Sequence, residues 1–229
     1  MNDSFLIRNI AYNIQHNNPD CNINKADLAI YGQYLTRICA KYGNLQAFEI
    51  LIKLGVNIEL CLTHLIELAA SGGYKNMLIR LLDIGIADRE IYQKESIYLS
   101  ALHWVVKSGD IDCLRTVLAT ITSTQNYSDI QIYTRAINIA IKNHFAVSLE
   151  LLIEHSKRIV YYNIYEKATA IYEYIPDIEF CIQAVESNNT DITTVLKQQY
   201  PHIFKSIKEQ LLKIAFSNEN TDMTKIICL

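Results

Sequence analysis

The side chains of this 229-residue chain that could carry out chemistry are few and widely spaced. Its six histidines form neither an H-x-x-x-H nor an H-E-x-x-H pattern, so the sequence predicts no zinc site. Its six cysteines include no C-x-x-C pair, and several lie in apolar helical patterns. That placement is typical of reduced, buried thiols in a cytosol-like compartment. We therefore predict neither a bound metal nor a cofactor.

The sequence also lacks the motifs of nucleotide binding and acyl transfer. It contains no G-x-x-x-x-G-K-[ST], no G-x-G-x-x-G and no G-x-S-x-G pattern. Asp110 and Asp112 form a close acidic pair, but the helix dipole favours carboxylates at the start of a helix. The sequence therefore predicts a protein that is not an enzyme. The alternative is an enzyme with a site of dispersed residues, or the regulatory part of an enzyme.

Composition restricts the class of partner. Half of the residues are hydrophobic, which is enough for a packed core, and the formal net charge of -3 argues against a nucleic-acid surface. No stretch approaches the roughly 20 apolar residues that span a bilayer, and the N-terminus does not resemble a signal peptide. We expect a cytoplasmic protein, in its own cell or in a host cell, that binds no membrane.

The glycines indicate a repeated structural unit. Gly43 and Gly55 are separated by the same interval as Gly73 and Gly85, and the segments between them are alike. A short apolar helical pattern precedes each segment. The unit is therefore predicted to be a helix, a tight turn, a second helix and a glycine stop.

The same unit recurs along the chain. Aligned units place one turn residue at six positions, separated by 30, 36, 35, 44 and 31 residues: Gly43, Gly73, Gly109, His144, Asn188 and Glu219. We predict a left-handed backbone at each, which glycine tolerates best and asparagine next. Histidine and glutamate suit this conformation less well.

These units resemble the ankyrin repeat. Ser100–His103 stands where that family has T-P-L-H, Ala69, Ala70 and Gly73 match A-A-x-x-G, and Leu54–Ile58 resembles G-A-D-V-N. No unit carries the full consensus, and the T-P dipeptide is absent. The resemblance implies an all-α solenoid of about six degenerate helix-turn-helix repeats, with a structural role for His103. The tetratricopeptide repeat is a poorer match because its signature is missing.

Two segments lie outside the repeated unit. Residues 1–33 are predicted to form an N-terminal helical cap or a decayed repeat, with Ser4 as N-cap, ahead of an array over residues 34–229. The long step between the fourth and fifth units contains a Tyr-rich insertion near residues 156–177. We predict a helix near Ile164–Ile175 there, with some tyrosines exposed to a partner.

The resemblance implies that a partner protein binds the concave face, which the ends of the first helices and the loop fingers line. Three of the first four units have lysine two residues before the turn, which indicates either a basic stripe or lysines that only keep the face soluble. The candidate partner-binding residues are Lys41, Tyr42, Lys107, Ser108, Lys142, Asn143, Tyr161, Tyr162 and Tyr165.

The final helix, predicted over residues 221–229, is too apolar for one narrow buried stripe. We expect some of its side chains to remain uncovered, which indicates either self-association through the C-terminal repeat or a chain that has lost further repeats. On this interpretation, Ile227→Lys leaves the fold intact and prevents a dimer.

Overall fold

The computed structural model describes residues 3–16, 25–87, 91–123, 130–166 and 178–228. These residues form helices joined by short connections, with no strand among them, and the predicted all-α class is confirmed. The chain divides into two compact units, Met1–Thr120 and Ile121–Leu229, and each is described separately.

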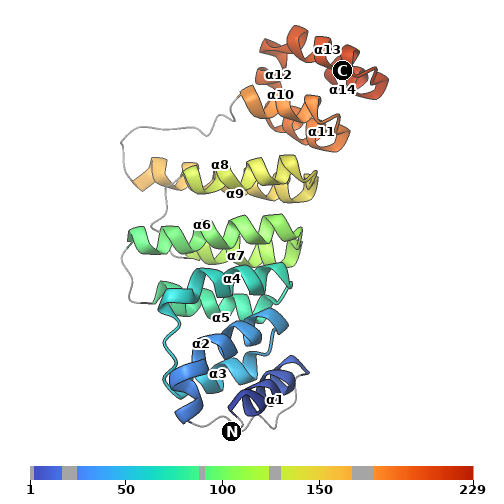
Figure 1. Cartoon of the computed structure of the whole chain (residues 1–229). Coiled ribbons are helices and arrows are strands. Elements are labelled where there is room, and N and C mark those ends of the chain that lie inside the picture. Colours follow the sequence, from blue (N-terminus) through green and yellow to red (C-terminus); the bar gives the residue numbers. More distant parts are fainter. Residues whose placement is uncertain (1–2, 17–24, 88–90, 124–129, 167–177, 229) are drawn as a thin grey trace. The chain divides into compact units, whose positions relative to one another are not determined.

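The first unit contains a single helix, α1 (Asp3–Gln15), and three antiparallel helix pairs (Figure 1). The pairs are α2 (Lys25–Tyr42) with α3 (Leu45–Lys53), α4 (Leu62–Ser71) with α5 (Lys75–Ile86), and α6 (Ile91–Ser108) with α7 (Ile111–Ser123). The last three residues of α7 belong to the second unit. A short 3-10 helix, η1 (Glu59–Cys61), leads into α4. The first helices of the pairs pack side by side, α2 against α4 and α4 against α6, and α1 packs on α2.

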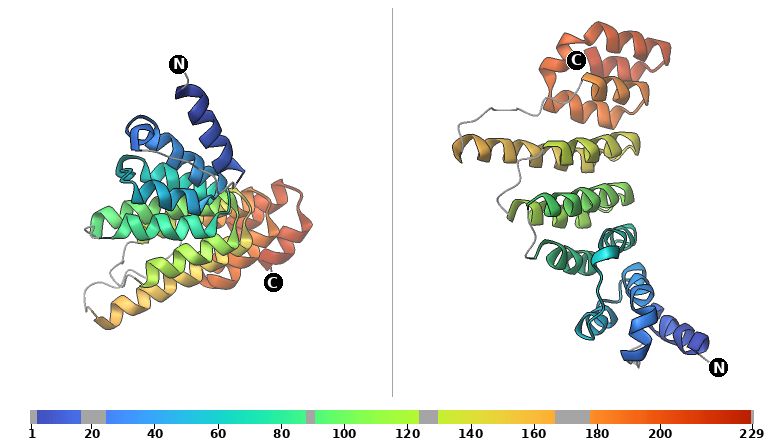
Figure 2. Two further views of the ribbon diagram at one scale, coloured as in Figure 1. Left: turned by 90° about the horizontal axis from the view of Figure 1, so that it is seen from below. Right: turned by 60° about the vertical axis from the view of Figure 1, so that its left-hand side comes forward.

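The second unit repeats this organisation (Figure 2). Its pairs are α8 (Ile130–Lys142) with α9 (Ala146–Glu166), α10 (Ile178–Glu186) with α11 (Thr190–Gln199), and α13 (Lys208–Ser217) with α14 (Thr221–Cys228). Pro201 opens a short extra helix, α12 (Pro201–Ser206), between the last two pairs. First helices again pack on first helices, as α10 does on α8 and α13, and α11 packs on α9 and α14.

The turn between the two helices of each pair contains the residue with left-handed backbone that the sequence predicts. The six φ angles lie between +54° and +74°, and three of them belong to residues other than glycine: Gly43, Gly73, Gly109, His144, Asn188 and Glu219. The register derived from the sequence is therefore confirmed at every turn, including the turns at His144 and Glu219.

Hydrogen bonds explain why these turns are so tight. In five of them the residue after the turn residue donates its backbone N–H to a carbonyl five residues earlier, as Asn44 does to Cys39. This is the bond that closes a Schellman motif at a helix C-terminus. The residue that donates it then begins the second helix, and the side chain of Asn44 accepts the N–H of Ala47 as an N-cap.

Successive turns contact one another inside each unit. The Tyr74 ring packs so closely on Gly43 that a β-carbon on that glycine would overlap it, and Asp110 packs on Gly73 in the same way. In the second unit, Asn220 donates from its side chain to that of Asn188. At these three places, adjacent helix pairs are therefore in contact at the turn as well as through the apolar core.

The N-terminal helix belongs to this packing. Ile10 and Ile14 are buried, and Asn44 donates its side-chain N–H to the carbonyl of Ile14. α1 already begins at Asp3, so Ser4 lies in its first turn and is not the N-cap that the sequence predicts. The boundary expected between residues 33 and 34 falls inside α2, which begins at Lys25.

The long step between the fourth and fifth units is partly taken up by α9. This helix has 21 residues, whereas α3 has 9 and α5 has 12. It extends to Glu166, so only the beginning of the helix predicted over Ile164–Ile175 lies among the described residues. The rest of that segment falls outside them.

The final helix corrects one expectation. Met223 is fully buried and Ile227 is only 4% exposed, so a lysine at Ile227 would disrupt the core of the second unit. The large apolar side chain that is exposed at this end is Phe216, near the end of α13. Cys228 of the final helix is exposed, as the sequence pattern allows, but Ile227 is buried and the pattern did not single out Phe216.

Candidate functional site

The two residues before each turn are the candidate contact positions, and they lie at the C-terminal end of each first helix, either in its last turn or directly after it. Among these twelve residues, eleven are exposed, and only Tyr42 is half-buried. The left-handed turn explains the exposure, because it directs the chain away from the helix end into the next helix without covering it.

Two of the candidate lysines lie over aromatic rings. The Nζ atom of Lys107 is 4.4 Å from the centroid of the Trp104 ring, and that of Lys41 is 5.4 Å from the Tyr42 ring. Trp104 also meets His103 edge to face, with the ring centroids 5.0 Å apart. A cation above a ring face is attracted by about 0.5–1 kcal/mol at exposed sites, so both ammonium groups are partly held in place.

The polar residues beside these lysines have a local structural role. Ser108 donates to the carbonyl of Val105 at 2.9 Å, and Asn143 donates to that of Ile139 at 2.8 Å. Carbonyls in a final helical turn lack partners within the helix, and Ser108 supplies one to Val105, whereas the Ile139 carbonyl accepts both the backbone and the side-chain N–H of Asn143. Because Ser108 and Asn143 already satisfy their own helices, the lysines are the stronger candidates for contact with a partner.

The predicted basic stripe is divided between the two units. Lys41 and Lys107 belong to the first unit, on α2 and α6, which both pack against α4. Lys142 and Asn143 are exposed at the end of α8 in the second unit. The geometry therefore brings the first two lysines onto one surface, and Lys142 is described only within its own unit.

The tyrosine candidates are placed by their backbone alone. Tyr161, Tyr162 and Tyr165 lie on the last part of α9, where the structure describes the helix but not the side chains. Their predicted exposure remains a prediction.

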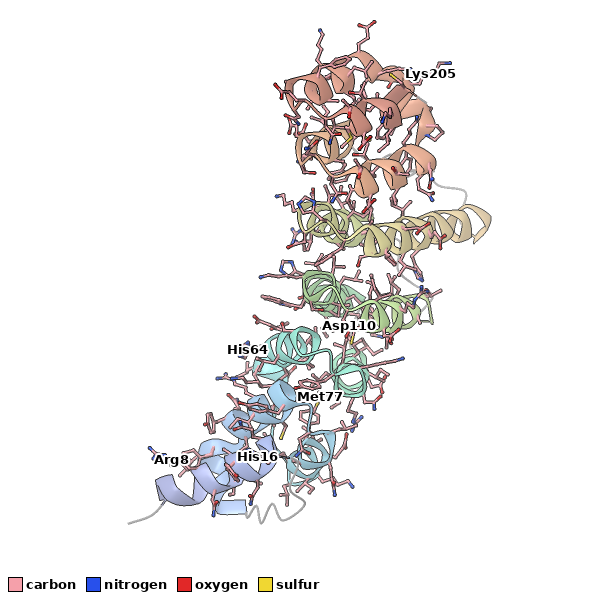
Figure 3. All side chains as sticks on the ribbon, turned by 90° about the vertical axis from the view of Figure 1, so that its right-hand side faces the viewer. Arg8, His16, His64, Met77, Asp110 and Lys205 are labelled. Atoms are coloured by element: carbon pink, nitrogen blue, oxygen red, sulfur yellow. The ribbon has the colours of Figure 1, made fainter. Side chains whose placement is uncertain are left out.

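Three exposed apolar residues of the first unit were not singled out from the sequence. Ile30 is 73% exposed, Tyr34 is 51% exposed, and Leu60 is 90% exposed. The sequence does relate two of them, because Ile30 and Leu60 each stand 13 residues before a turn glycine and so occupy equivalent positions in adjacent units. His64, which extends from the outer side of α4 in Figure 3, stands at the same offset from its turn as Tyr34.

No protein-family model, curated protein or solved structure matches this chain.

Three further features concern the possible chemistry. No group of three or more His, Cys, Asp or Glu residues that could hold a metal ion occurs within the described ranges. None of the helices described has both the length and the apolar character to cross a bilayer. Asp110 accepts the backbone N–H of Cys113 at 2.8 Å as the N-cap of α7, which confirms a structural role for that carboxylate.

The cysteines behave as the sequence predicts in four of the five described cases. Cys39, Cys61, Cys113 and Cys181 are free and buried, whereas Cys228 is free and exposed. Burial, helped by the neighbouring Asp110 carboxylate, raises the pKa of the Cys113 thiol to about 11. Burial raises the pKa of the Cys181 thiol to about 12. Both thiols are therefore protonated and unreactive near neutral pH.

Proposed function

We propose that the six helix pairs are degenerate repeats of ankyrin type, and that the chain is a non-catalytic scaffold that binds a partner protein. Each pair has the predicted turn with a left-handed residue, and contacts join the first three turns and the last two. Repeat proteins of this kind expose a large surface for their mass, because each repeat contacts only its neighbours. Because a fold alone does not assign a function, the proposal rests on the residues exposed at the surface.

One observation carries the proposal: the helix ends before all six turns are exposed, and two of them in the first unit hold a lysine over an aromatic ring. Arginine and aromatic side chains are enriched where proteins bind one another, and lysines held in place lose less entropy on binding. The partner is expected to bind across the ends of the first helices and the loops that precede them.

The test is affinity capture from the native cell with the whole chain as bait. The variant carries Lys41→Glu, Lys107→Glu and Lys142→Glu, and its matched control carries Lys53→Glu, Lys75→Glu and Lys205→Glu. All six lysines are exposed, so both variants change the net charge equally. We expect the first variant to lose proteins that the wild type and the control retain. Identical sets of captured proteins from all three baits would contradict the proposal.

A further inference from the structure

The exposed side of α2 changes in chemistry from one end to the other. Ile30, Tyr34, Arg37 and Lys41 follow one another at intervals of four, three and four residues, which places them on one stripe of the helix. All four are exposed. The stripe is apolar where α2 begins and cationic where it ends.

The neighbouring first helices continue both ends of this stripe. Leu60, which precedes α4, occupies the position equivalent to Ile30, so two exposed aliphatic side chains stand at the same offset in adjacent repeats. Lys107 on α6 occupies the position equivalent to Lys41. Since α4 packs against both α2 and α6, the three helices present one surface with an apolar end and a basic end.

Two carboxylates accompany these side chains: Glu59 is exposed beside Leu60, and the half-buried Glu67 stands at the position equivalent to Arg37. The Oε2 atom of Glu67 on α4 lies 3.1 Å from Nδ1 of His64. Its charge is thus partly engaged with a neighbour of its own helix, whereas Arg37, Lys41 and Lys107 carry exposed positive charge.

We propose that this surface of the first unit binds an acidic segment of a partner protein whose large apolar side chains lie at one end and whose carboxylates lie at the other. The inference rests on the proposed function and specifies its partner. Ile30, Tyr34 and Leu60 contact the apolar part, and Arg37, Lys41 and Lys107 bind the carboxylates.

Two arguments support this occupant. Aliphatic side chains exposed by 73% and 90% contribute little to the core, and adjacent exposed apolar side chains mark association sites. The basic end selects an acidic partner, because complementary charge raises the association rate and excludes basic competitors. The two ends are 11 residues apart on α2, which corresponds to about 16 Å of helix, or about five residues of an extended peptide.

The experiment selects peptides from a displayed random library on the whole chain. Wild type is compared with Lys41→Glu/Lys107→Glu and with Ile30→Ser/Leu60→Ser. The matched controls are Lys53→Glu/Lys75→Glu, which reverses two exposed lysines on second helices, and Val147→Ser, which removes an exposed apolar side chain on α9. Thermal unfolding of every variant shows that the chain remains folded.

We expect wild type to enrich peptides with Asp or Glu clustered at one end and large apolar residues at the other. The lysine pair variant should bind a synthetic copy of the enriched peptide about tenfold more weakly, since two exposed ion pairs are lost, and added salt should weaken wild-type binding. The Ile30 and Leu60 variant should lose affinity without changing the salt dependence.

The other possible outcomes contradict this inference, the proposed function, or both. Enriched peptides that are basic, or that show no separation of charge and apolar residues, yet are sensitive to these substitutions, would overturn this inference and leave the proposed function standing. Peptides that bind wild type, Lys41→Glu/Lys107→Glu and Ile30→Ser/Leu60→Ser equally well would overturn the proposed function. An absence of any enrichment on wild type would count against both.

Discussion

The six turns depend on single residues that adopt a backbone conformation unfavourable to most side chains. A left-handed φ brings the β-carbon close to the following carbonyl, which costs roughly 1–2 kcal/mol for residues other than glycine. The chain accepts this at His144, Asn188 and Glu219, where the packing of the helix pair imposes the turn. Asparagine reduces the penalty because its short polar side chain can hydrogen-bond locally.

Replacing the two least suitable turn residues with glycine should stabilise the protein. We expect His144→Gly and Glu219→Gly each to raise the free energy of unfolding by about 0.5 kcal/mol, since glycine relieves the strain but gains more entropy when unfolded. Both side chains are exposed, so little packing is lost. Urea unfolding monitored by circular dichroism provides the measurement.

The opposite substitution at Gly43 is the control. Gly43→Ala combines the left-handed penalty with overlap between the new methyl group and the Tyr74 ring, and it should destabilise by more than about 1 kcal/mol. If Gly43→Ala were neutral, or if both glycine variants were destabilised, strain at the turns would not be the explanation.

The buried thiols make stability depend on alkaline pH. The pKa values of Cys113 and Cys181 are raised to about 11 and about 12, above the ordinary value of 9.0, because burial disfavours the thiolate. Their contribution is therefore complete below about pH 9 and is lost as pH rises towards the folded-state values, by up to about 1.4 kcal/mol per pH unit for each thiol.

We expect the urea midpoint to fall between pH 8 and pH 10. Cys181→Ala should be less stable than wild type at pH 8, since it leaves a small cavity, but it should lose less stability on going to pH 10. Equal losses in the two proteins over this interval would exclude the Cys181 thiol as a cause.

At the scale of single elements, the pairing of helices was readable from the sequence because two kinds of signal agree. The turn glycines and asparagines mark where each first helix ends, and the apolar spacing marks the buried faces. Phe48 and Leu51 on α3, for example, are fully buried. The boundaries were less readable: α2 begins nine residues earlier than the expected start of the array, inside a polar segment.

Which apolar residues remain exposed could not be predicted in the same way. Ile30 and Leu60 resemble core residues by type, but Ile30 in α2 and Leu60 in η1, just before α4, are exposed. Ile227 and Phe216 were misassigned for a related reason, because burial depends on whether a neighbouring helix covers the position. The intervals within one helix do not contain that information.

The last helix of the second unit depends on two lysines from other elements. Lys197 on α11 hydrogen-bonds the carbonyl of Ile226, and Lys208 on α13 donates to that of Cys228 at 3.3 Å. Carbonyls at a helix C-terminus lack partners within the helix and carry partial negative charge, so a cation there is favourable.

Removing the more buried of these lysines should loosen α14. We expect Lys197→Met to lower the free energy of unfolding by about 1 kcal/mol and to speed amide hydrogen exchange in Met223–Ile227 more than in the rest of the second unit. Lys213→Met on the exposed side of α13 is the control and should change neither quantity. Uniform acceleration of exchange across the second unit would indicate general destabilisation instead.

At the scale of the whole molecule, Phe216 is the exception to a regular pattern of burial. It lies three residues before its turn, and the five equivalent residues are at most 1% exposed: Ala40, Ala70, Val106, Ile141 and Val185. Phe216 is 63% exposed. In the second unit the equivalent residues lie where one first helix packs on the next, as α8 does on α10 and α10 on α13.

Other residues of the last pair are also more exposed than the equivalent residues of earlier pairs. Leu212, seven residues before the turn, is half-buried, whereas Ile137 and Cys181 at that offset are buried. Cys228, nine residues after the turn, is exposed, whereas Ile153 is buried. Leu212, Phe216 and Cys228 therefore form an end face whose positions bury their side chains elsewhere in the chain.

We expect this end face to associate with the same face of a second copy, which makes a two-fold interface from one surface. The two Phe216 rings would together contribute at most about 4 kcal/mol, so the dimer should be weak, with a dissociation constant of about 1 mM. Sedimentation equilibrium over a wide concentration range measures it. Phe216→Glu should leave only monomer, whereas Val147→Glu, which changes another exposed apolar residue on α9, should not. In a Cys21→Ser background, a short bismaleimide should link two copies through Cys228, the exposed thiol of this face. A wild type that stays monomeric at millimolar concentration and is not cross-linked through Cys228 would show that this face does not self-associate.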